Sequence, residues 1–338
     1  MAITCQSGGT RTIVLYHLHL HNRIVFYVPA SPCQRIDSDL FPGIVLWMKR
    51  DDLLHPQVSG NKFRKLKYPL LALKDRQPHL VSMGGLWSNH IHALAHAAAI
   101  AGYPSTAFIR AADGMNSDML DDCRRLGMEI HYVSREIYRR LRENDQHWRS
   151  LLLDANEDYV WLPEGGSTPA ALHGVAELVI EVGATLGSDP DVFMVACGTG
   201  ATMAGIIAGA QGKSKVIGVA AIKNAEYLHA DISRLLKNAA YPDDQNYLLL
   251  TDFHQGGYAK ITIELMTFCD MFQQQTGIIL EPVYTGKMLY TLHQLCKQNY
   301  FPPQTCVVAV HTGGLQGNRG FSDTPLFARI SVASTAKR

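Results

Sequence analysis

Short apolar runs alternate along the chain with longer segments in which apolar residues recur at helical spacing. The short runs predict buried strands at 45–49, 80–83, 106–109, 129–133, 192–196, 216–221 and 306–310. The longer segments predict helices at 88–101, 117–126, 135–153, 169–186, 202–210, 260–275 and 287–298. Because strands that alternate with helices build parallel sheets with helices on both faces, the pattern indicates an α/β fold.

The composition is typical of a globular protein, with 338 residues of which 47% are apolar and 18% are charged. The formal net charge of +1 gives no reason to expect a nucleic-acid or membrane partner. Seven cysteines without a CxxC pair are typical of reduced thiols. The chain starts without a secretory pattern, and no apolar run is long enough to span a membrane. We therefore expect a cytoplasmic protein, and without an HExxH motif or clustered acids we expect no metal site.

A glycine turn follows the apolar run at 192–196 and precedes a predicted helix, a junction that aims backbone N–H groups at one point and suits a phosphate. A nucleotide-binding loop of the Walker type requires Gly-Lys-Ser/Thr, but Met203 and Ala204 follow here. A dinucleotide fingerprint requires Gly or Ala at Met203. The turn therefore favours a single phosphate monoester over a nucleotide, or binds nothing. Its residues are Gly198, Thr199, Gly200, Ala201 and Thr202.

Two further glycine-bearing loops carry candidate chemistry. The segment SGNKFRK is interpreted as a loop that contains Lys62. A lysine forms an imine only when its amine is neutral, which requires burial or nearby cations. A solvent-exposed lysine is the alternative. Ser88, Asn89 and His90 stand at a predicted helix start after Gly84 and Gly85. Ser88 is either a helix N-cap or part of a site that binds a substrate carboxylate, and the Asn89 amide can bond a ring oxygen of a cofactor.

Six segments in order, GNKFRKL, GGLWSNH, GGS, CGTGATMAG, EPVYTGK and HTGG, resemble the tryptophan-synthase-β-like pyridoxal-phosphate enzymes. Within them the chain looks like the branch of 1-aminocyclopropane-1-carboxylate deaminase and D-cysteine desulfhydrase. The resemblance covers about 35–321 and implies the two-lobed fold type II. It implies a large cofactor-anchoring domain (1–62 plus 163–338), a small domain with the asparagine loop (63–162), and a homodimer.

The resemblance also implies roles for single residues. Lys62 corresponds to the Schiff-base lysine and proton shuttle, Asn89 to the contact with the ring hydroxyl, and the turn at 198–202 to the phosphate site. Ser88 corresponds to a catalytic serine near the substrate carboxylate, and Ser88, Asn89 and His90 are expected to bind the substrate. Tyr258 and Tyr284 correspond to active-site tyrosines.

One position distinguishes the two activities of this branch. The deaminase has a glutamate after the tyrosine, whereas Thr285 stands here, and Thr312 is a second neutral candidate to bond the pyridine nitrogen. A hydroxyl leaves the ring a weaker electron sink than an acid does, which suits β-elimination better than cyclopropane opening. We therefore expect a D-cysteine desulfhydrase-like enzyme that gives pyruvate, ammonia and sulfide from a small amino acid. The alternatives are a deaminase that gives 2-oxobutyrate and a cofactor-binding protein without turnover.

Overall fold

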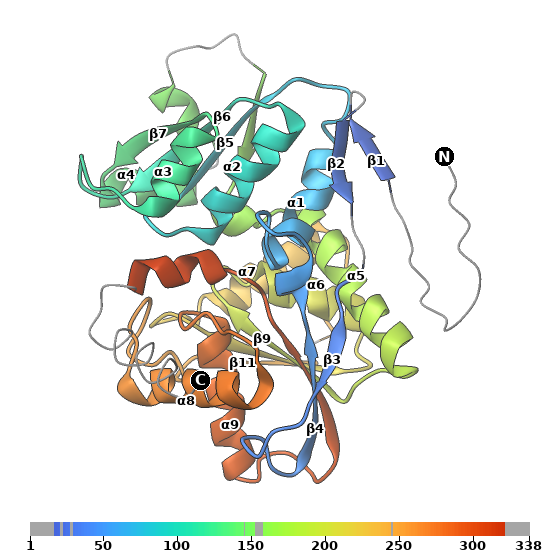
Figure 1. Cartoon of the computed structure of the whole chain (residues 1–338). Coiled ribbons are helices and arrows are strands. Elements are labelled where there is room, and N and C mark those ends of the chain that lie inside the picture. Colours follow the sequence, from blue (N-terminus) through green and yellow to red (C-terminus); the bar gives the residue numbers. More distant parts are fainter. Residues whose placement is uncertain are drawn as a thin grey trace.

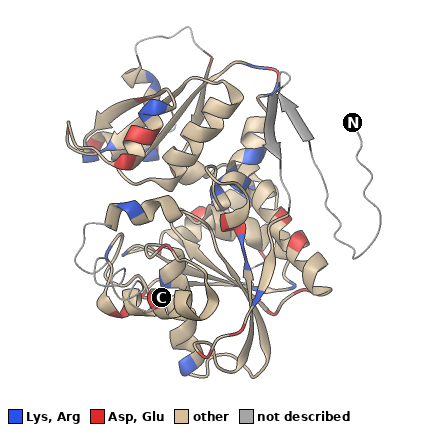
Figure 2. Ribbon diagram, viewed as in Figure 1, with Lys and Arg blue, Asp and Glu red and all other residues tan. Residues whose placement is uncertain are grey.

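The computed structural model describes residues 17–20, 23–27, 30–144, 146–152, 158–244 and 246–321. Two sheets dominate these residues, one above the other in Figure 1, with helices around each. A separate antiparallel pair joins β1 (His17–Leu20) to β2 (Arg23–Tyr27). Basic and acidic residues are interspersed over the ribbon in Figure 2, as the net charge of +1 suggests.

The larger sheet has six strands in the order β11-β10-β9-β12-β4-β3. All its neighbours are parallel except β3, which pairs antiparallel with β4 at the edge, so the sheet is mixed. Its strands are β3 (Cys33–Ile36), β4 (Ile44–Lys49), β9 (Val192–Cys197), β10 (Lys215–Ala220), β11 (Tyr247–Leu250) and β12 (Thr305–Val310).

Alternate residues of β9 face opposite sides of the larger sheet, as the pleat requires. Phe193 and Val195 pack under α5 (Pro169–Leu186), α6 (Ala201–Ala210) and α7 (Leu228–Asn238). Val192 and Met194 pack against α8 (Ile263–Thr276) and α9 (Thr285–Lys297). In α5 the length and apolar composition would also suit a membrane span, but this helix packs on its neighbours in the core.

The smaller sheet is wholly parallel, in the order β7-β6-β5-β8. Its strands are β5 (His79–Gly85), β6 (Ser105–Arg110), β7 (Met128–Val133) and β8 (Tyr159–Leu162). One face carries α1 (Asn61–Leu71), α2 (Asn89–Ala101) and α3 (Asp118–Arg125), and the other carries α4 (Arg135–Glu143) and η2 (His147–Leu151). The remaining 3-10 helices are η1 (Asp51–Leu53), η3 (Glu164–Gly166) and η4 (Leu315–Phe321).

The α/β class is confirmed, and two local predictions are wrong. Lys62 does not lie in a loop, because α1 begins at Asn61. The helix predicted over 135–153 ends at Glu143, where Asn144 takes an extended conformation. All strands of the smaller sheet fall within 63–162, but α1 packs on both this sheet and α5. The predicted division into a small and a large domain therefore stays a prediction.

Two glycines let α1 approach its neighbours closely. Gly60 has a φ of 63°, and a Cβ there would stand 1.8 Å from the carbonyl oxygen of Thr312. Gly174 in α5 faces the backbone of Arg64, whose carbonyl oxygen would lie 2.1 Å from an added Cβ. Only glycine fits either contact without backbone movement. These approaches fix the first turn of α1 between α5 and the segment after β12.

A buried ion-pair network, which we call the Arg64 network, connects α1 with β4, η1 and α5. The Arg64 guanidinium donates to Asp51 at 2.6 and 2.8 Å and to Glu181 at 2.9 and 2.8 Å. Lys49 Nζ donates to the same Glu181 carboxylate at 2.5 Å. Burial alone would raise the pKa of Glu181, but the hydrogen bonds and charge of Arg64 hold it below its ordinary value. Two cations and two carboxylates thus balance each other inside the protein.

Replacing Arg64 by methionine should destabilise the fold by about 3–5 kcal/mol, because it leaves buried carboxylates without their partner. Urea unfolding at neutral pH measures the loss. Because the ion pairs lower the pKa of Glu181, their stabilisation disappears as the pH falls through that lowered pKa, so wild type and variant should converge in acid. Arg76→Met, which removes an exposed partner of Asp158, is the control and should barely move the midpoint. Equal effects of the two substitutions would contradict the assignment.

Candidate active site

A cavity of about 280 Å³ lies where the carboxyl ends of both sheets meet. The ends of β5, β6 and β9 reach it at Gly85, Arg110 and Cys197, and Thr312 follows β12 into it. This is where α/β folds bind ligands. It unites most of the residues that the sequence singled out, namely Lys62, Ser88, Asn89, His90, Gly198, Thr199, Gly200, Thr202, Tyr258, Tyr284 and Thr312.

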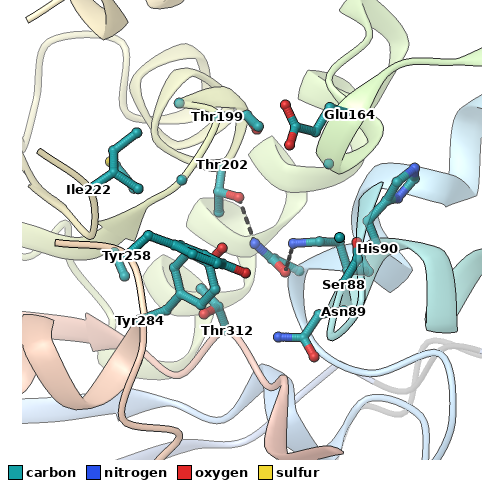
Figure 3. A pocket seen from close by; sticks show the side chains of 18 of the residues that line it. Ser88, Asn89, His90, Glu164, Thr199, Thr202, Ile222, Tyr258, Tyr284 and Thr312 are labelled. Atoms are coloured by element: carbon teal, nitrogen blue, oxygen red, sulfur yellow. Dashed lines mark hydrogen bonds between the residues drawn. The ribbon is translucent and has the colours of Figure 1, made fainter. Parts of the chain in front are cut away.

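Lys62 stands in the first turn of α1, and its ammonium faces the cavity from a desolvated position. Its Nζ donates to Asn61 Oδ1 at 3.0 Å, and Asn61 Nδ2 donates to Thr202 Oγ1 at 2.8 Å (Figure 3). One amide therefore connects the lysine to the glycine turn. Burial lowers the pKa of Lys62 to about 8, and the Glu281 carboxylate opposes that shift. The amine is thus neutral far more often than that of an exposed lysine.

The glycine turn joins β9 to α6 and is built for an anion. Gly200, at φ 77°, is the N-cap of α6, and no side chain caps that helix. Its first N–H groups consequently lie open to a ligand. Thr199 is fixed from outside by Ser167, with 2.6 Å between their hydroxyl oxygens, so the GGS segment supports the turn. Ala201 is buried behind the cavity surface.

Lys65, one turn after Lys62, lines the cavity, whereas the sequence left open whether it is a cation near Lys62 or a solvent-facing side chain. Its Nζ donates to the Gly165 carbonyl oxygen at 3.1 Å. Burial, followed by the charge of Lys62, holds the pKa of Lys65 well below its ordinary value. The spacing of three from Lys62 was a signal that both side chains share a helix face, but only once the segment is known to be a helix.

The asparagine loop combines a helix cap with an oriented amide. Ser88 caps α2 by accepting from the N–H of Ile91 at 3.3 Å, so the capping interpretation is confirmed. Its hydroxyl still lines the cavity. Asn89 Oδ1 accepts from Gln316 Nε2 at 2.5 Å, which orients the amide from η4. The Asn89 side chain points into the same space as Thr312 in Figure 3.

His90, which was predicted to contact the substrate, has a ring that points away from Tyr258 and Tyr284 in Figure 3. Its Nε2 lies 2.9 Å from Ser82 Oγ. Because Ser82 donates its own proton to the Leu162 carbonyl oxygen, Nε2 carries the proton of the His90 ring. Burial, with the charge of Lys62, keeps the pKa of His90 well below its ordinary value. The neutral ring therefore supports the loop, and its direct contact with a substrate remains a prediction.

Tyr258 and Tyr284 form an edge-on pair with ring centroids 6.2 Å apart. Tyr284 contacts the Gly198 backbone, where a Cβ would lie 3.1 Å from its Cε1. The Glu281 carboxylate accepts from the N–H of Val283 and from that of Tyr284, both at 2.8 Å. Burial raises the pKa of Glu281 to about 7. This acid fixes the backbone that carries Tyr284.

Lys287 is a residue that sequence reasoning missed. Its fully buried Nζ donates to the carbonyl oxygen of Gly257 at 2.7 Å and to that of Ala221 at 3.3 Å. Gly257 directly precedes Tyr258, so this lysine ties α9, which follows Tyr284, to the loop that carries the other tyrosine. Burial lowers the pKa of Lys287 to about 8.

The two threonines proposed for the ring nitrogen lie at different depths. Thr312 lines the cavity, whereas Thr285 is fully buried at the start of α9. Their hydroxyl oxygens are 3.3 Å apart. Thr312 is therefore the threonine that can contact a ligand, and Thr285 lies behind it, where the two hydroxyl groups are close enough to hydrogen-bond. In the described part of the chain, no three His, Cys, Asp or Glu side chains gather to hold a metal ion.

These features fit pyridoxal phosphate. The uncapped turn of α6 suits a phosphate monoester, the desolvated Lys62 amine suits an aldehyde, and Asn89 and Thr312 offer bonds to opposite polar atoms of a ring.

Known proteins resemble the chain over most of its length. A family model for "Pyridoxal-phosphate dependent enzyme" matches residues 26–313. A putative 1-aminocyclopropane-1-carboxylate deaminase of Thermotoga maritima is 31% identical, over 81% of this chain and 90% of its own. A bifunctional D-cysteine desulfhydrase/1-aminocyclopropane-1-carboxylate deaminase of Arabidopsis thaliana is 29% identical, over 81% and 73%. The crystal structure of an "ACC deaminase homologue" has a TM-score of 0.75 at 27% identity, over 88% and 93%.

The reactivity of Lys62 should rise with pH. Because its pKa is lowered to about 8, its neutral fraction increases about tenfold between roughly pH 7 and 9. We expect the rate of imine formation between cofactor-free protein and pyridoxal phosphate to increase with the neutral fraction of Lys62. The visible absorbance of the imine measures this rate. Borohydride reduction should fix the adduct on Lys62. A Lys62→Ala variant that still forms the reducible adduct would refute the assignment, and Lys67→Met, in the same helix outside the cavity, is the matched control.

Lys287→Met should release the loop that carries Tyr258 and lower kcat by about 10- to 100-fold, because small misplacements of a catalytic group are costly. If Lys287 acts through Tyr258, the substitution should cause little further loss in a Tyr258→Phe background. Steady-state kinetics of the four proteins measures this coupling. Lys297→Met, at the exposed end of the same helix, is the control. If the double variant instead loses kcat by the product of the two single losses, Lys287 does not act through Tyr258.

Proposed function

Because the chain belongs to the pyridoxal-phosphate dependent enzyme family, we propose that it eliminates the β-substituent of a small amino acid, with D-cysteine as the model substrate. It is an enzyme of the fold type II group that includes 1-aminocyclopropane-1-carboxylate deaminases and D-cysteine desulfhydrase. The reaction breaks the Cα–H and Cβ–S bonds, expels sulfide, and gives 2-aminoacrylate, which water converts to pyruvate and ammonia. We further propose that the enzyme is a cytoplasmic homodimer.

Some residues of the cavity hold the cofactor, and others transfer protons. We assign the phosphate to the turn at 198–202 with Lys65 nearby, the aldehyde to Lys62, the ring hydroxyl to Asn89 and the ring nitrogen to Thr312. When bound, the cofactor supplies an electron sink that acidifies the substrate Cα–H. Lys62, whose lowered pKa of about 8 leaves about half of its amine neutral at that pH, takes that proton at its Nζ.

The substrate side of the cavity is formed by the asparagine loop and the tyrosine pair. We assign the substrate carboxylate to Ser88 and the start of α2, where free N–H groups and the helix dipole favour an anion. Tyr258 and Tyr284 lie on the opposite side in Figure 3. Burial holds the pKa of Tyr284 well above its ordinary value, so its phenol keeps its proton and can donate it to the leaving sulfur.

The observation that carries the preference for elimination is the neutral pair of hydroxyls at Thr312 and Thr285, 3.3 Å apart. A hydroxyl partner leaves the ring nitrogen unprotonated, and the sink is then strong enough chiefly when a departing group removes the charge. The deaminase reaction remains the second candidate, because the Thermotoga maritima relative carries that name. A protein without turnover is disfavoured, since these relatives are named as enzymes.

We expect the protein to release pyruvate and sulfide from D-cysteine with a kcat/KM at least about tenfold higher than that for 2-oxobutyrate release from 1-aminocyclopropane-1-carboxylate, a gap of about 1.4 kcal/mol. Product assays on both compounds, L-cysteine and D-serine measure it. Thr312→Val should lower kcat for D-cysteine about five- to tenfold through loss of one hydrogen bond, and Thr312→Ser should restore it. Efficient opening of the cyclopropane by wild type would overturn the argument from neutral hydroxyls.

A further inference from the structure

The outer half of the active-site cavity contains a polar group that the proposed reaction does not use. Arg110, the last residue of β6, lines the cavity together with Tyr138 and Arg142 of α4, Glu164 of η3, and Tyr227. None of these residues has been assigned to the cofactor or to the α-carboxylate. Since Ser88 lines the same cavity, we place in the space that they surround the β-substituent of a substrate held at Ser88.

The Glu164 carboxylate in this group is already engaged. Its Oε1 accepts from the Tyr138 hydroxyl at 2.5 Å, and its Oε2 forms an ion pair with Arg142, whose Nε lies 3.2 Å away. The charge of Arg142 is thereby matched. Burial raises the pKa of Tyr138 far above its ordinary value, and the charge of Glu164 adds to the shift, so this phenol remains a donor to Glu164.

Arg110 is different, because its guanidinium has no carboxylate partner among the described residues. It lies over the Tyr138 ring, with 5.1 Å between its Cζ and the ring centroid, and its side chain is exposed to the cavity mouth. This cation–π contact holds the guanidinium near the ring and leaves its N–H groups available. The interaction therefore presents a preorganised fork for a planar anion.

The charges that line the cavity give the same result. Burial lowers the pKa values of Lys62 and Lys65, and Lys62 is assigned to the aldehyde. The two arginines that line the cavity, Arg110 and Arg142, keep their charge and face one carboxylate, Glu164. The substrate α-carboxylate is assigned to the start of α2. At the outer end, Arg142 is matched by Glu164 and Arg110 is unmatched.

We propose that Arg110 is a specificity-determining residue that binds a carboxylate or similar anion at the far end of the β-substituent. The proposal rests on the elimination reaction proposed above and names its substrate class, which is a β-substituted alanine whose leaving group carries a second acidic function. Elimination then breaks the Cα–H and Cβ–S bonds and releases an anionic thiol, whose sulfur takes a proton. Water converts the remaining 2-aminoacrylate to pyruvate and ammonia.

The test uses the holoenzyme and a matched pair of substrates, S-carboxymethyl-D-cysteine and its side-chain amide, with their L enantiomers alongside. The two compounds differ only in the terminal charge. Pyruvate release gives kcat/KM for each, and wild type should prefer the acid. Because hydrogen bonds to charged groups contribute about ten- to hundredfold in affinity, Arg110→Met should reduce the acid-to-amide ratio by at least about tenfold. Arg110→Lys should retain part of it, and Arg110→Glu should reverse it.

A binding measurement separates this proposal from the proposed reaction. In 2-aminoadipate and its 6-amide a methylene replaces the sulfur, so neither compound can lose its β-substituent. Calorimetric titration of the holoenzyme should give the same change in the acid-to-amide ratio of Kd values on Arg110→Met. If no amino acid yields pyruvate while this ratio holds, the elimination fails and the anion site stands.

The control is Arg139→Met, on α4 outside the active-site cavity, which should keep the wild-type ratio. Three results would overturn the proposal. An acid-to-amide ratio of one in wild type would show that the cavity does not select the anion. An unchanged ratio in Arg110→Met would leave Arg110 with a packing role only. Equal losses for acid and amide would assign Arg110 to the α-carboxylate instead.

Discussion

The site depends on one constraint, which is that the first turn of α1 stays fixed against the larger sheet. The Arg64 network provides it, since Arg64 lies two residues after Lys62 and its guanidinium reaches Asp51 and Glu181. Buried ion pairs add little net stability compared with apolar residues of the same shape, but they tolerate only one geometry. Here that geometry sets the position of the Lys62 amine, and Gly60 and Gly174 supply the close contacts that leave α1 no room to shift.

The same burial that makes the fold rigid gives the lysines their chemistry. Lys62, Lys65 and Lys287 all have lowered pKa values, with desolvation as the leading cause, yet they serve different ends. Lys287 bonds two backbone carbonyl oxygens and organises the tyrosine loop. Lys65 bonds one, at Gly165. Among the residues that the structure describes, the Lys62 amine donates to the Asn61 side chain alone, so it is the lysine whose amine can still react with an aldehyde.

The sequence predicted what depends on local pattern and missed what depends on distant partners. The turn at 198–202 and the cap at Ser88 were readable because a strand, small residues and a helix follow one another directly. The sequence did not show that Lys62 is helical, because the start of α1 depends on a distant partner. There the N–H of Asn61 donates to the carbonyl oxygen of Thr312, far along the chain. The hydrogen-bond partner of Lys65, the Gly165 carbonyl oxygen, likewise lies 100 residues further along the chain.

Other omissions had a signal that was weak or overlooked. In α7 the apolar residues Leu228, Ile232 and Leu235 recur at helical spacing, so this helix was predictable. The edge strand β3, CQRI, is too short and polar to recognise. The end of α4 was hidden because its outer face is charged throughout, and charge alone does not show where a helix stops.

Glu281 decides how the neutral threonines should be interpreted. It is the buried acid of the EPVYTGK segment, and a carboxylate near the ring would argue for a protonated nitrogen and a strong sink. Both of its oxygens, however, accept backbone N–H groups, so the acid is committed to positioning Tyr284. The hydroxyl of Thr312 then remains as the group that faces the ring. A weak sink requires a leaving group that removes negative charge, and a cation at Arg110 favours such a group at the cavity mouth. The hydroxyl that faces the ring and the unmatched cation at the outer end are thus both compatible with the proposed elimination.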